Sequence, residues 1–375
     1  MRIYLDNNAT TAIHPDVLHV LETSLRDVFG NASSIHKEGQ QARRVIEDAR
    51  ESVAGLLNAT AREIVFTSGG TESNNAAIFG AVGEGSRSHI VTSAIEHPSV
   101  AEAVRELERR GHPVTRVHPT RDGAVNASDV IDALRDDTRL VAVMLANNET
   151  GVIQPVAAIG EACRARNIHF HCDAVQGAGK MRVDVEALAC DTLAISAHKM
   201  HAPKGIGALF VRKGLTMQSH MFGGAQERRR RAGTENVPLA AAFGLAAKLA
   251  ADAPLAQIAA CRDAFEALVR SSLDVTINGA NVARVANTSN ITFHDADGEG
   301  IVIALDLAGV AVSTGSACSS GRVEPSSVLL AMGLSPDDAR ATVRFSLSRF
   351  TTGAELETVA ALLADLVPRC KRISR

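Results

Sequence analysis

Short apolar runs alternate with amphipathic stretches over the first two thirds of the chain. The apolar runs, which are typical of buried strands, lie at residues 63–67, 89–92, 140–145, 168–173, 192–196 and 208–211. Apolar side chains at helical spacing mark residues 16–26, 39–57, 72–80, 99–110 and 155–166. This alternation predicts a mostly parallel sheet covered by helices on both faces. In such sheets the functional side chains are expected at the carboxyl ends of the strands.

The pattern changes near residue 250, where an Ala-rich helical stretch leads into a more mixed region. Strands are expected there at residues 275–277, 290–293 and 343–347, and helices at residues 299–307 and 355–367. We therefore expect an α/β protein with two domains. Residues 15–250 would form a large domain around a mostly parallel sheet, and residues 1–14 and 251–375 would form a smaller α+β domain.

Composition narrows the classes of function. With 46% hydrophobic and 22% charged residues the chain has an ordinary globular composition, and its formal net charge of −3 argues against nucleic acid or an anionic membrane as a partner. No apolar run approaches the roughly 20 residues of a membrane helix, and no signal peptide is evident, so we expect a cytoplasmic protein. The charged run at residues 227–231 is interpreted as a structural or substrate-facing loop. The six cysteines show no CxxC pairs and no metal-ligand spacing, so neither a disulfide framework nor a resident metal is expected.

Three residues indicate a specific chemistry. Lys199 lies between two apolar runs, flanked by Ser and His and followed by a Pro/Gly turn. A lysine in a loop is most often solvated, but Asp173 also ends an apolar strand and Cys318 lies in a loop of small residues. A lysine, a strand-end aspartate and a loop cysteine together favour pyridoxal phosphate (PLP) chemistry with a sulfur nucleophile.

A candidate phosphate site precedes the helix expected at residues 72–80. The sequence Ser-Gly-Gly-Thr at residues 68–71, which includes Gly70 and Thr71, joins a strand to that helix. Backbone amides and the helix dipole would point at an anion there, although an ordinary Gly-rich turn has the same sequence pattern. Ser196 and His198, which flank Lys199, favour the phosphate interpretation.

Ten short motifs resemble those of cysteine desulfurases in the class V aminotransferase superfamily, closest to the nitrogen-fixation and iron–sulfur assembly type. They occur in family order over nearly the whole chain, at residues 4–11, 30–36, 66–73, 96–98, 146–151, 173–176, 198–199, 231–236, 315–318 and 344–347. The resemblance implies the fold of PLP-dependent transferases, which is aspartate aminotransferase-like and of fold type I. It also implies conversion of L-cysteine to L-alanine, with the sulfur left on an enzyme cysteine as a persulfide.

The resemblance implies three catalytic residues. Lys199 would carry the cofactor and act as the base at the substrate Cα. Cys318 would attack the substrate sulfur and hold it as a persulfide, with transient contact to an iron–sulfur cluster as a further option. His97 would stack on the cofactor ring and move protons.

Further residues would bind the cofactor and the substrate. A carboxylate at Asp173 would keep the ring nitrogen protonated, so that the ring accepts electrons from Cα. By resemblance, Gln176 would contact the ring hydroxyl, and Asn148 would lie close to both ring and substrate. Thr234 would reach the phosphate from a neighbouring subunit, which implies a homodimer. Arg344 would bind the substrate carboxylate through a bidentate pair, which lysine would form less well.

Two departures from the family pattern concern loops and partners. Ala32 replaces a usual proline, which would loosen one loop. The chain ends at Arg375, where relatives carry a tail that helps to dock the scaffold protein receiving the sulfur. This departure leaves open which partner receives the sulfur. The resemblance still implies a sulfur acceptor or iron–sulfur scaffold as a partner, while nitrogenase assembly, general iron–sulfur assembly and thiolated cofactor synthesis stay open.

Three alternative functions share most of these residues. A class V aminotransferase would need Lys199, Asp173 and Arg344 but would have no use for Cys318. A selenocysteine lyase would use nearly the same machinery as a desulfurase. A non-catalytic scaffold is disfavoured by the presence of Lys199, Asp173, His97 and Cys318 together.

Overall fold

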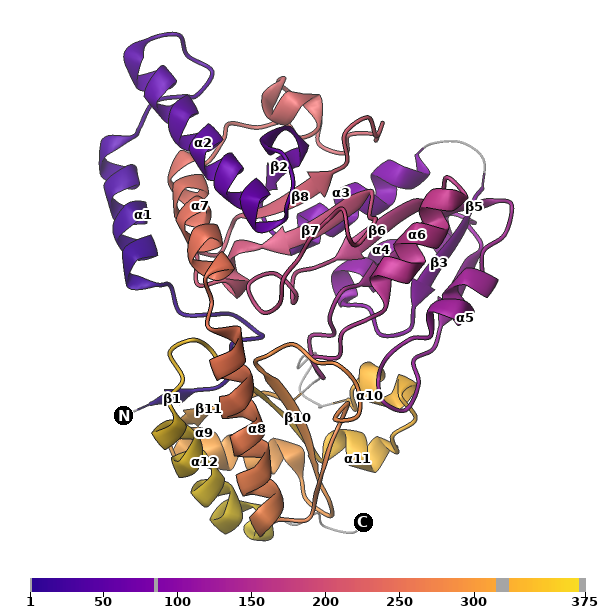
Figure 1. The fold of residues 1–375 in the computed structure, drawn as a ribbon, viewed down its shortest axis with the longest axis vertical. Coiled ribbons are helices and arrows are strands. Elements are labelled where there is room, and N and C mark those ends of the chain that lie inside the picture. Colours follow the sequence, from indigo (N-terminus) through magenta and orange to yellow (C-terminus); the bar gives the residue numbers. More distant parts are fainter. Residues whose placement is uncertain (1, 84–86, 315–323, 371–375) are drawn as a thin grey trace.

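A seven-stranded sheet with the strand order β2-β8-β7-β6-β5-β3-β4 forms the centre of the larger body of the protein. The computed structural model describes residues 2–83, 87–314 and 324–370 (Figure 1). Its strands are β2 (Ile64–Thr67), β3 (His89–Ser93), β4 (Val114–Val117), β5 (Thr138–Met144), β6 (His169–Asp173), β7 (Thr192–Ser196) and β8 (Gly207–Val211). All neighbouring strands pair in parallel except β8, which is antiparallel to both β2 and β7. The mostly parallel sheet predicted from the sequence is confirmed.

Helices cover both faces of this sheet (Figure 1). They are α1 (Pro15–Asp27), α2 (Lys37–Leu56), α3 (Gly70–Val82), α4 (Pro98–Arg109), α5 (Ala127–Asp132), α6 (Val156–Ala165) and α7 (Val237–Ala251), with short 3-10 turns at η1 (Ala61–Glu63), η2 (Ala197–Lys199) and η3 (Gln226–Arg229). The strand β5 shows why two layers form. Its Leu140 and Ala142 pack with α3 and α4, whereas Val141 and Val143 belong to the core on the opposite face.

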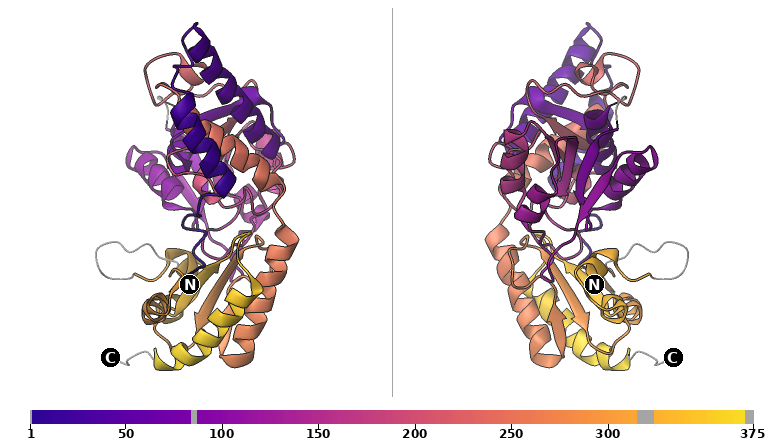
Figure 2. Two further views of the ribbon diagram at one scale, coloured as in Figure 1. Left: turned by 90° about the vertical axis from the view of Figure 1, so that its left-hand side faces the viewer. Right: turned by 90° about the vertical axis from the view of Figure 1, so that its right-hand side faces the viewer.

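The smaller body lies below the sheet in Figure 1 and has its own apolar core. It contains the strands β1 (Ile3–Tyr4), β9 (Val275–Ile277), β10 (Thr288–Phe293), β11 (Val310–Ala311) and β12 (Thr342–Ser346) and the helices α8 (Leu255–Ser272), α9 (Gly298–Leu307), α10 (Ser327–Ala331), α11 (Pro336–Arg340), α12 (Gly353–Leu366) and η4 (Val367–Arg369). An antiparallel sheet of order β12-β10-β9 packs against α8, α9 and α12, and β1 pairs in parallel with β11. The side views of Figure 2 show α8 and α12 lying along one side of this sheet.

The two bodies are joined by the N-terminal segment and by the break between α7 and α8. The segment at residues 6–11 runs between them: the Asn7 amide donates to the Ser346 carbonyl of β12, and the Thr11 amide donates to the His198 carbonyl beside η2. No single described helix is long and apolar enough to cross a membrane; α7 and α8 pass together by length and composition, but a bend of 71° separates them.

Several elements were not predicted from the sequence, among them β4, α5 and α8. The strand β4 lies at the sheet edge and is only partly buried, and α5 is short, so neither has a strong apolar period. The Ala-rich stretch expected near residues 249–254 contains a helix break, because Pro254 precedes α8 and has no N–H to donate to the preceding turn. The long helix α8 that follows was read only as part of a mixed region.

Candidate active site

A cavity of about 180 Å³ lies at the carboxyl ends of the central parallel strands. Nine of the residues predicted for the site line it: Gly70, Thr71, His97, Asn148, Asp173, Gln176, Ser196, His198 and Lys199. They come from the ends of, or the loops after, β2, β3, β5, β6 and β7. The carboxyl ends of parallel strands meet at one edge of the sheet, which is why motifs far apart in the sequence face the same space.

The Lys199 amine is held in a largely enclosed place. The residue ends η2, directly after β7, and its Nζ donates to the carbonyls of Asn8 and Ala9 at 2.5 and 2.8 Å. Burial, aided by the positive charge of Arg344 and opposed by Asp6, lowers the pKa of Lys199 to about 8. A sizeable fraction of this amine is therefore neutral near physiological pH, as a nucleophile or a base requires.

Asp173 is oriented by partners on both carboxylate oxygens. Its Oδ2 accepts from Asn74 Nδ2 at 2.8 Å, and its Oδ1 accepts from the Val175 amide at 3.0 Å. Asn74 also donates to Ser99 Oγ at 2.8 Å, and its own Oδ1 lies 2.9 Å from His171 Nε2. The carboxylate is thus fixed in direction at the cavity wall.

Asn74 was missed by the sequence analysis, although the sequence holds a signal for it. The residue is fully buried one turn into α3, where a side-chain amide must find partners, and the helix follows the candidate phosphate loop. The signal in the sequence is therefore a polar residue at a position of this helix that is expected to be buried.

His97 caps the helix α4 and faces the cavity. Its Nδ1 accepts from the Ser99 amide at 3.1 Å and lies 2.8 Å from Ser99 Oγ. Burial lowers the pKa of His97, and Lys199 acts in the same direction while Asp173 opposes it. Because Nδ1 is engaged as an acceptor, Nε2 is the ring nitrogen left for proton transfer.

The candidate phosphate end of the cavity consists of the N-terminus of α3 together with Ser196 and His198. Orphan amides and the helix dipole favour an anion at this place. A Cβ at Gly70 would come within 2.8 Å of Val175 Cγ2 in the cavity wall, so a residue without a side chain suits this position. Burial, with the nearby charges of Lys199 and Lys204, lowers the pKa of His198 to about 4, so the ring is neutral at physiological pH.

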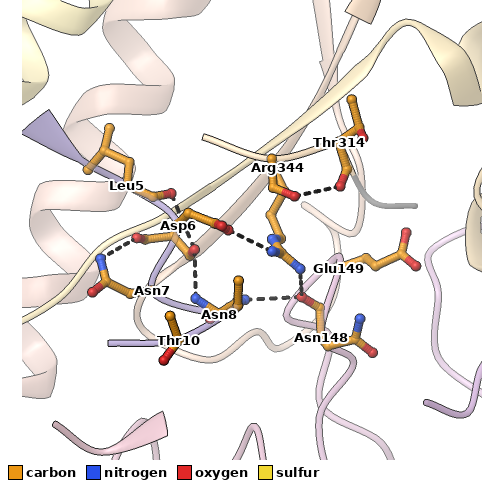
Figure 3. Close-up of polar contacts among 12 residues, drawn as sticks. Leu5, Asp6, Asn7, Asn8, Thr10, Asn148, Glu149, Thr314 and Arg344 are labelled. Atoms are coloured by element: carbon orange, nitrogen blue, oxygen red, sulfur yellow. Dashed lines mark hydrogen bonds and ion pairs between the residues drawn. The ribbon is translucent and has the colours of Figure 1, made fainter. Parts of the chain in front are cut away.

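Arg344, on β12 of the smaller body, lies beside the cavity residue Asn148 and contacts Asp6 (Figure 3). Its Nη2 donates to Asp6 Oδ1 at 2.8 Å and its Nη1 donates to the Asn148 carbonyl at 2.9 Å. Its Nε is buried and has no hydrogen-bond partner within the described residues. A buried guanidinium with an unused donor next to the cavity residue Asn148 is suited to bind a carboxylate.

Besides Arg344, two further predicted site residues are not among the described residues that line this cavity. Thr234 is exposed in the single chain and borders a separate hollow of about 230 Å³ with Ser68 and Arg231, so its contact with a phosphate stays a prediction about a second subunit. Cys318 lies outside the described residues. The flanking Thr314 is adjacent to Ser313, whose amide and carbonyl pair with Arg344 on β12.

The charged run at residues 227–231 has structural partners. The buried carboxylate of Glu227 pairs with Arg50 Nη1 at 2.6 Å and accepts from the Phe66 amide at 3.0 Å. Arg231 pairs with Glu72 on α3 at 2.9 Å. The structural interpretation of this loop is therefore confirmed for these two residues.

Three of the described cysteines lack the exposure and the thiolate form that a sulfur nucleophile requires. Cys163, Cys172 and Cys190 are buried, and Cys261 and Cys370 are partly exposed. Burial raises the pKa of Cys163 and Cys190 to about 12 and raises that of Cys172 well above its ordinary value, which suppresses the thiolate form.

The donor set fits PLP. The cofactor has a phosphate, a basic ring nitrogen, a ring hydroxyl and an aldehyde, and the cavity offers a helix N-terminus, the fixed Asp173 carboxylate, the Gln176 amide and the Lys199 amine. Gly70, where a Cβ would collide with Val175, lets the start of α3 approach the cavity wall closely. No cluster of three His, Cys, Asp or Glu side chains suited to a metal ion occurs in the described part of the chain.

A family model for class-V aminotransferases matches residues 3–359, and the chain belongs to this family. The curated cysteine desulfurase of Nostoc sp. (strain PCC 7120) is 42% identical over 377 residues, which cover 99% of this chain and 94% of that protein.

Two solved structures are similar over nearly the whole chain. One, described as a NifS-like protein, has a TM-score of 0.90 and 32% identity, and the match covers 98% of this chain and all of that one. The other, SspA in complex with cysteine, has a TM-score of 0.83 and 35% identity and covers 94% of this chain and all of that one. These findings confirm the predicted fold, PLP as the cofactor and cysteine desulfurase as the enzyme class.

Proposed function

We propose that this protein cleaves sulfur from L-cysteine, releases L-alanine and keeps the sulfur as a persulfide on Cys318 for an acceptor protein. The observation that carries this proposal is the meeting of three groups around one cavity. The Lys199 amine has a pKa near neutrality, the Asp173 carboxylate is fixed in direction, and Arg344 has an unused buried Nε beside Asn148. These groups suit a cofactor-bound amino acid whose carboxylate faces the smaller body.

In this proposal Arg344 and Asn148 hold the substrate carboxylate and so direct Cα toward Lys199. When bound, PLP withdraws electrons from the substrate and makes the C–S bond cleavable. Lys199 takes the proton from Cα, and His97 Nε2 moves a proton close to the ring. Asp173 keeps the ring nitrogen protonated, Gln176 faces the ring hydroxyl, and residues Gly70, Thr71, Ser196 and His198 bind the phosphate.

In the next step of this proposal, Cys318 accepts the sulfur. Its thiolate attacks the substrate sulfur, so that an S–S bond forms and the S–Cβ bond breaks with its electron pair left on carbon. The carbon takes up a proton and becomes the methyl group of alanine. A serine in this place would not replace cysteine, because a hydroxyl is a much weaker nucleophile than a thiolate at neutral pH.

We also propose that the active unit is a homodimer in which Thr234 of one subunit completes the phosphate site of the other. An iron–sulfur scaffold or another sulfur acceptor receives the persulfide sulfur. The free buried thiols fit a reducing compartment, so we place the protein in the cytoplasm.

The test is the fate of sulfur in the PLP-loaded protein given L-cysteine. Mass spectrometry should find one added sulfur on the Cys318 peptide, and Cys318→Ser should lower alanine release by more than about tenfold while the substrate still changes the visible spectrum. Cys261→Ser is the matched control and should behave as wild type. Normal alanine release by Cys318→Ser, without added sulfur at this position, would favour an aminotransferase or another lyase.

A further inference from the structure

Lys180 is a buried lysine whose strongest charged neighbours are themselves cations. The residue is 7% exposed and lies in the loop after β6, close to Gln176. Lys199 and Arg344, together with burial as the largest cause, lower its pKa well below the usual range. A buried lysine whose pKa is lowered tends to be uncharged. Its amine then needs hydrogen-bond acceptors but no counter-ion.

Two side-chain amides supply those acceptors. Lys180 Nζ donates to Asn8 Oδ1 at 2.8 Å and also makes a short contact with Gln176 Oε1. Even a neutral amine has two N–H groups, so both bonds are available to the uncharged form of this lysine. Because each amide turns its oxygen toward Lys180, each is forced to turn its NH₂ group elsewhere.

For Gln176, the NH₂ group is turned toward the reacting end of the cavity. Gln176 Nε2 donates to the Asn8 carbonyl at 2.9 Å, and the same oxygen accepts from Lys199 Nζ at 2.5 Å. The amide nitrogen of Gln176 and the amine of Lys199 are therefore neighbours through one shared acceptor. Gln176 also lines the cavity itself.

We propose that Lys180 is a positioning residue that holds Gln176 as a hydrogen-bond donor toward the cofactor. With Lys180 in place, the Gln176 amide presents N–H to the ring oxygen of PLP; without it, the amide can rotate and present its oxygen. A donor stabilises the anionic form of the ring oxygen, whereas an acceptor raises its proton affinity. This inference rests on the proposed function only in that PLP occupies this cavity.

A purely structural role makes a different prediction. Asn8 links the two bodies, because its Oδ1 also accepts from Asn287 Nδ2 at 3.1 Å and its Nδ2 donates to Thr288 Oγ1 at 2.8 Å. If Lys180 served only to steady this junction, its loss would lower thermal stability without changing the protonation of bound PLP. The pH response of the bound cofactor therefore separates the two roles.

The experiment compares PLP-loaded wild type with Lys180→Met, in which methionine keeps the apolar volume and removes both donors. The visible absorbance of bound PLP is titrated with pH, and its midpoint should rise by about one pH unit, a tenfold change in proton affinity. The other titratable groups around the cavity, which both proteins share, are His97, Asp173, His198 and Lys199. Asp6 and Arg344, which act on Lys199, are also unchanged.

Two further variants make the test specific. Asn287→Ala removes a different donor to Asn8 and leaves the Lys180–Gln176 bond in place, so its midpoint should stay at the wild-type value. In a Gln176→Leu background, Lys180→Met should cause no additional shift, because the effect travels through the Gln176 amide.

The outcomes are distinct. If Lys180→Met does not fold, Lys180→Gln, with a shorter donor, should shift the midpoint in the same direction by a smaller amount. An unchanged midpoint in every folded Lys180 variant, or an equal shift in Asn287→Ala, would overturn the positioning role. A wild-type protein that acquires no visible PLP band would instead contradict the proposed function.

Discussion

The proposed cofactor side and the proposed substrate side of the candidate active site are built differently. On the cofactor side, Asp173 and Lys199 stand directly at strand ends of one sheet, and Asn74, on the helix that follows β2, fixes the carboxylate. On the substrate side, Arg344 comes from the smaller body and pairs with Asp6, 338 residues away in the chain. The proposed cofactor side therefore lies within the larger body, while the proposed substrate side lies where the two bodies meet.

This difference also appears in the charges. Arg344 has a carboxylate partner in Asp6, whereas the Lys199 amine is held by backbone carbonyls. A cation satisfied by neutral acceptors in a buried place loses its proton more readily. The substrate side is therefore suited to binding a charge, and the cofactor side is suited to making and breaking bonds.

The largest effect is expected on the cofactor side, from Lys199→Ala. In the proposed function Lys199 is both the covalent anchor of PLP and the base at Cα, so alanine release should fall by about a thousandfold or more. The visible band of bound PLP should also be lost, while the far-UV circular dichroism stays as in wild type. Lys204→Ala, an exposed lysine close in sequence, is the control. Near-normal turnover by Lys199→Ala would show that this lysine has another role.

A smaller effect, of a different kind, is expected on the substrate side. Arg344→Lys should lower kcat/KM for L-cysteine by about 10- to 100-fold, mainly through KM, because a bidentate charge-assisted pair is worth about 1.5–3 kcal/mol. The absorbance of bound PLP should remain close to wild type. A loss of PLP in this variant would show that the two sides are not separable.

The pH dependence of PLP attachment should follow the Lys199 amine. The pKa of Lys199 is lowered to about 8, so the nucleophilic free amine is scarce below that pH and predominates above it. The rate at which the PLP-free protein gains its visible band should rise about tenfold per pH unit below pH 8 and level off above it. Stopped-flow absorbance from pH 6.5 to 9.5 measures this rate. A midpoint near the ordinary lysine value would indicate an exposed, unperturbed amine.

The smallest effect is expected from Thr234→Ala, which probes the proposed contribution of a second subunit to the cofactor side. Removing one hydroxyl contact to a phosphate should weaken PLP binding by about tenfold, corresponding to roughly 1.4 kcal/mol. The mass in solution, measured by light scattering, should stay that of a dimer. A fully active monomer would show that Thr234 of a second subunit is not part of the PLP site.

Parts of the fold and the site could be predicted because their signals are local. Each strand of the large sheet that carries a site residue is an apolar run; Asp173 ends one such run, and Lys199 lies three residues after the end of another. The edge strand β4 and the short helix α5 lacked that signal, since partial burial requires no continuous apolar run. The break between α7 and α8 was not predicted either, because the residues on both sides of it form one Ala-rich stretch.

The sequence by itself determined the alternation of strands and helices, and with it the edge of the sheet where Lys199 and Asp173 come together. Only the tertiary structure decided that Asp6 would pair with Arg344 and that Lys180, 172 residues from Asn8, would donate to it. The physical reason is that local spacing controls which face a side chain occupies, whereas burial and hydrogen-bond partners depend on where distant segments meet. From the sequence alone, Lys180 is indistinguishable from any other polar loop residue. The tertiary structure buries it between the side-chain amides of Asn8 and Gln176.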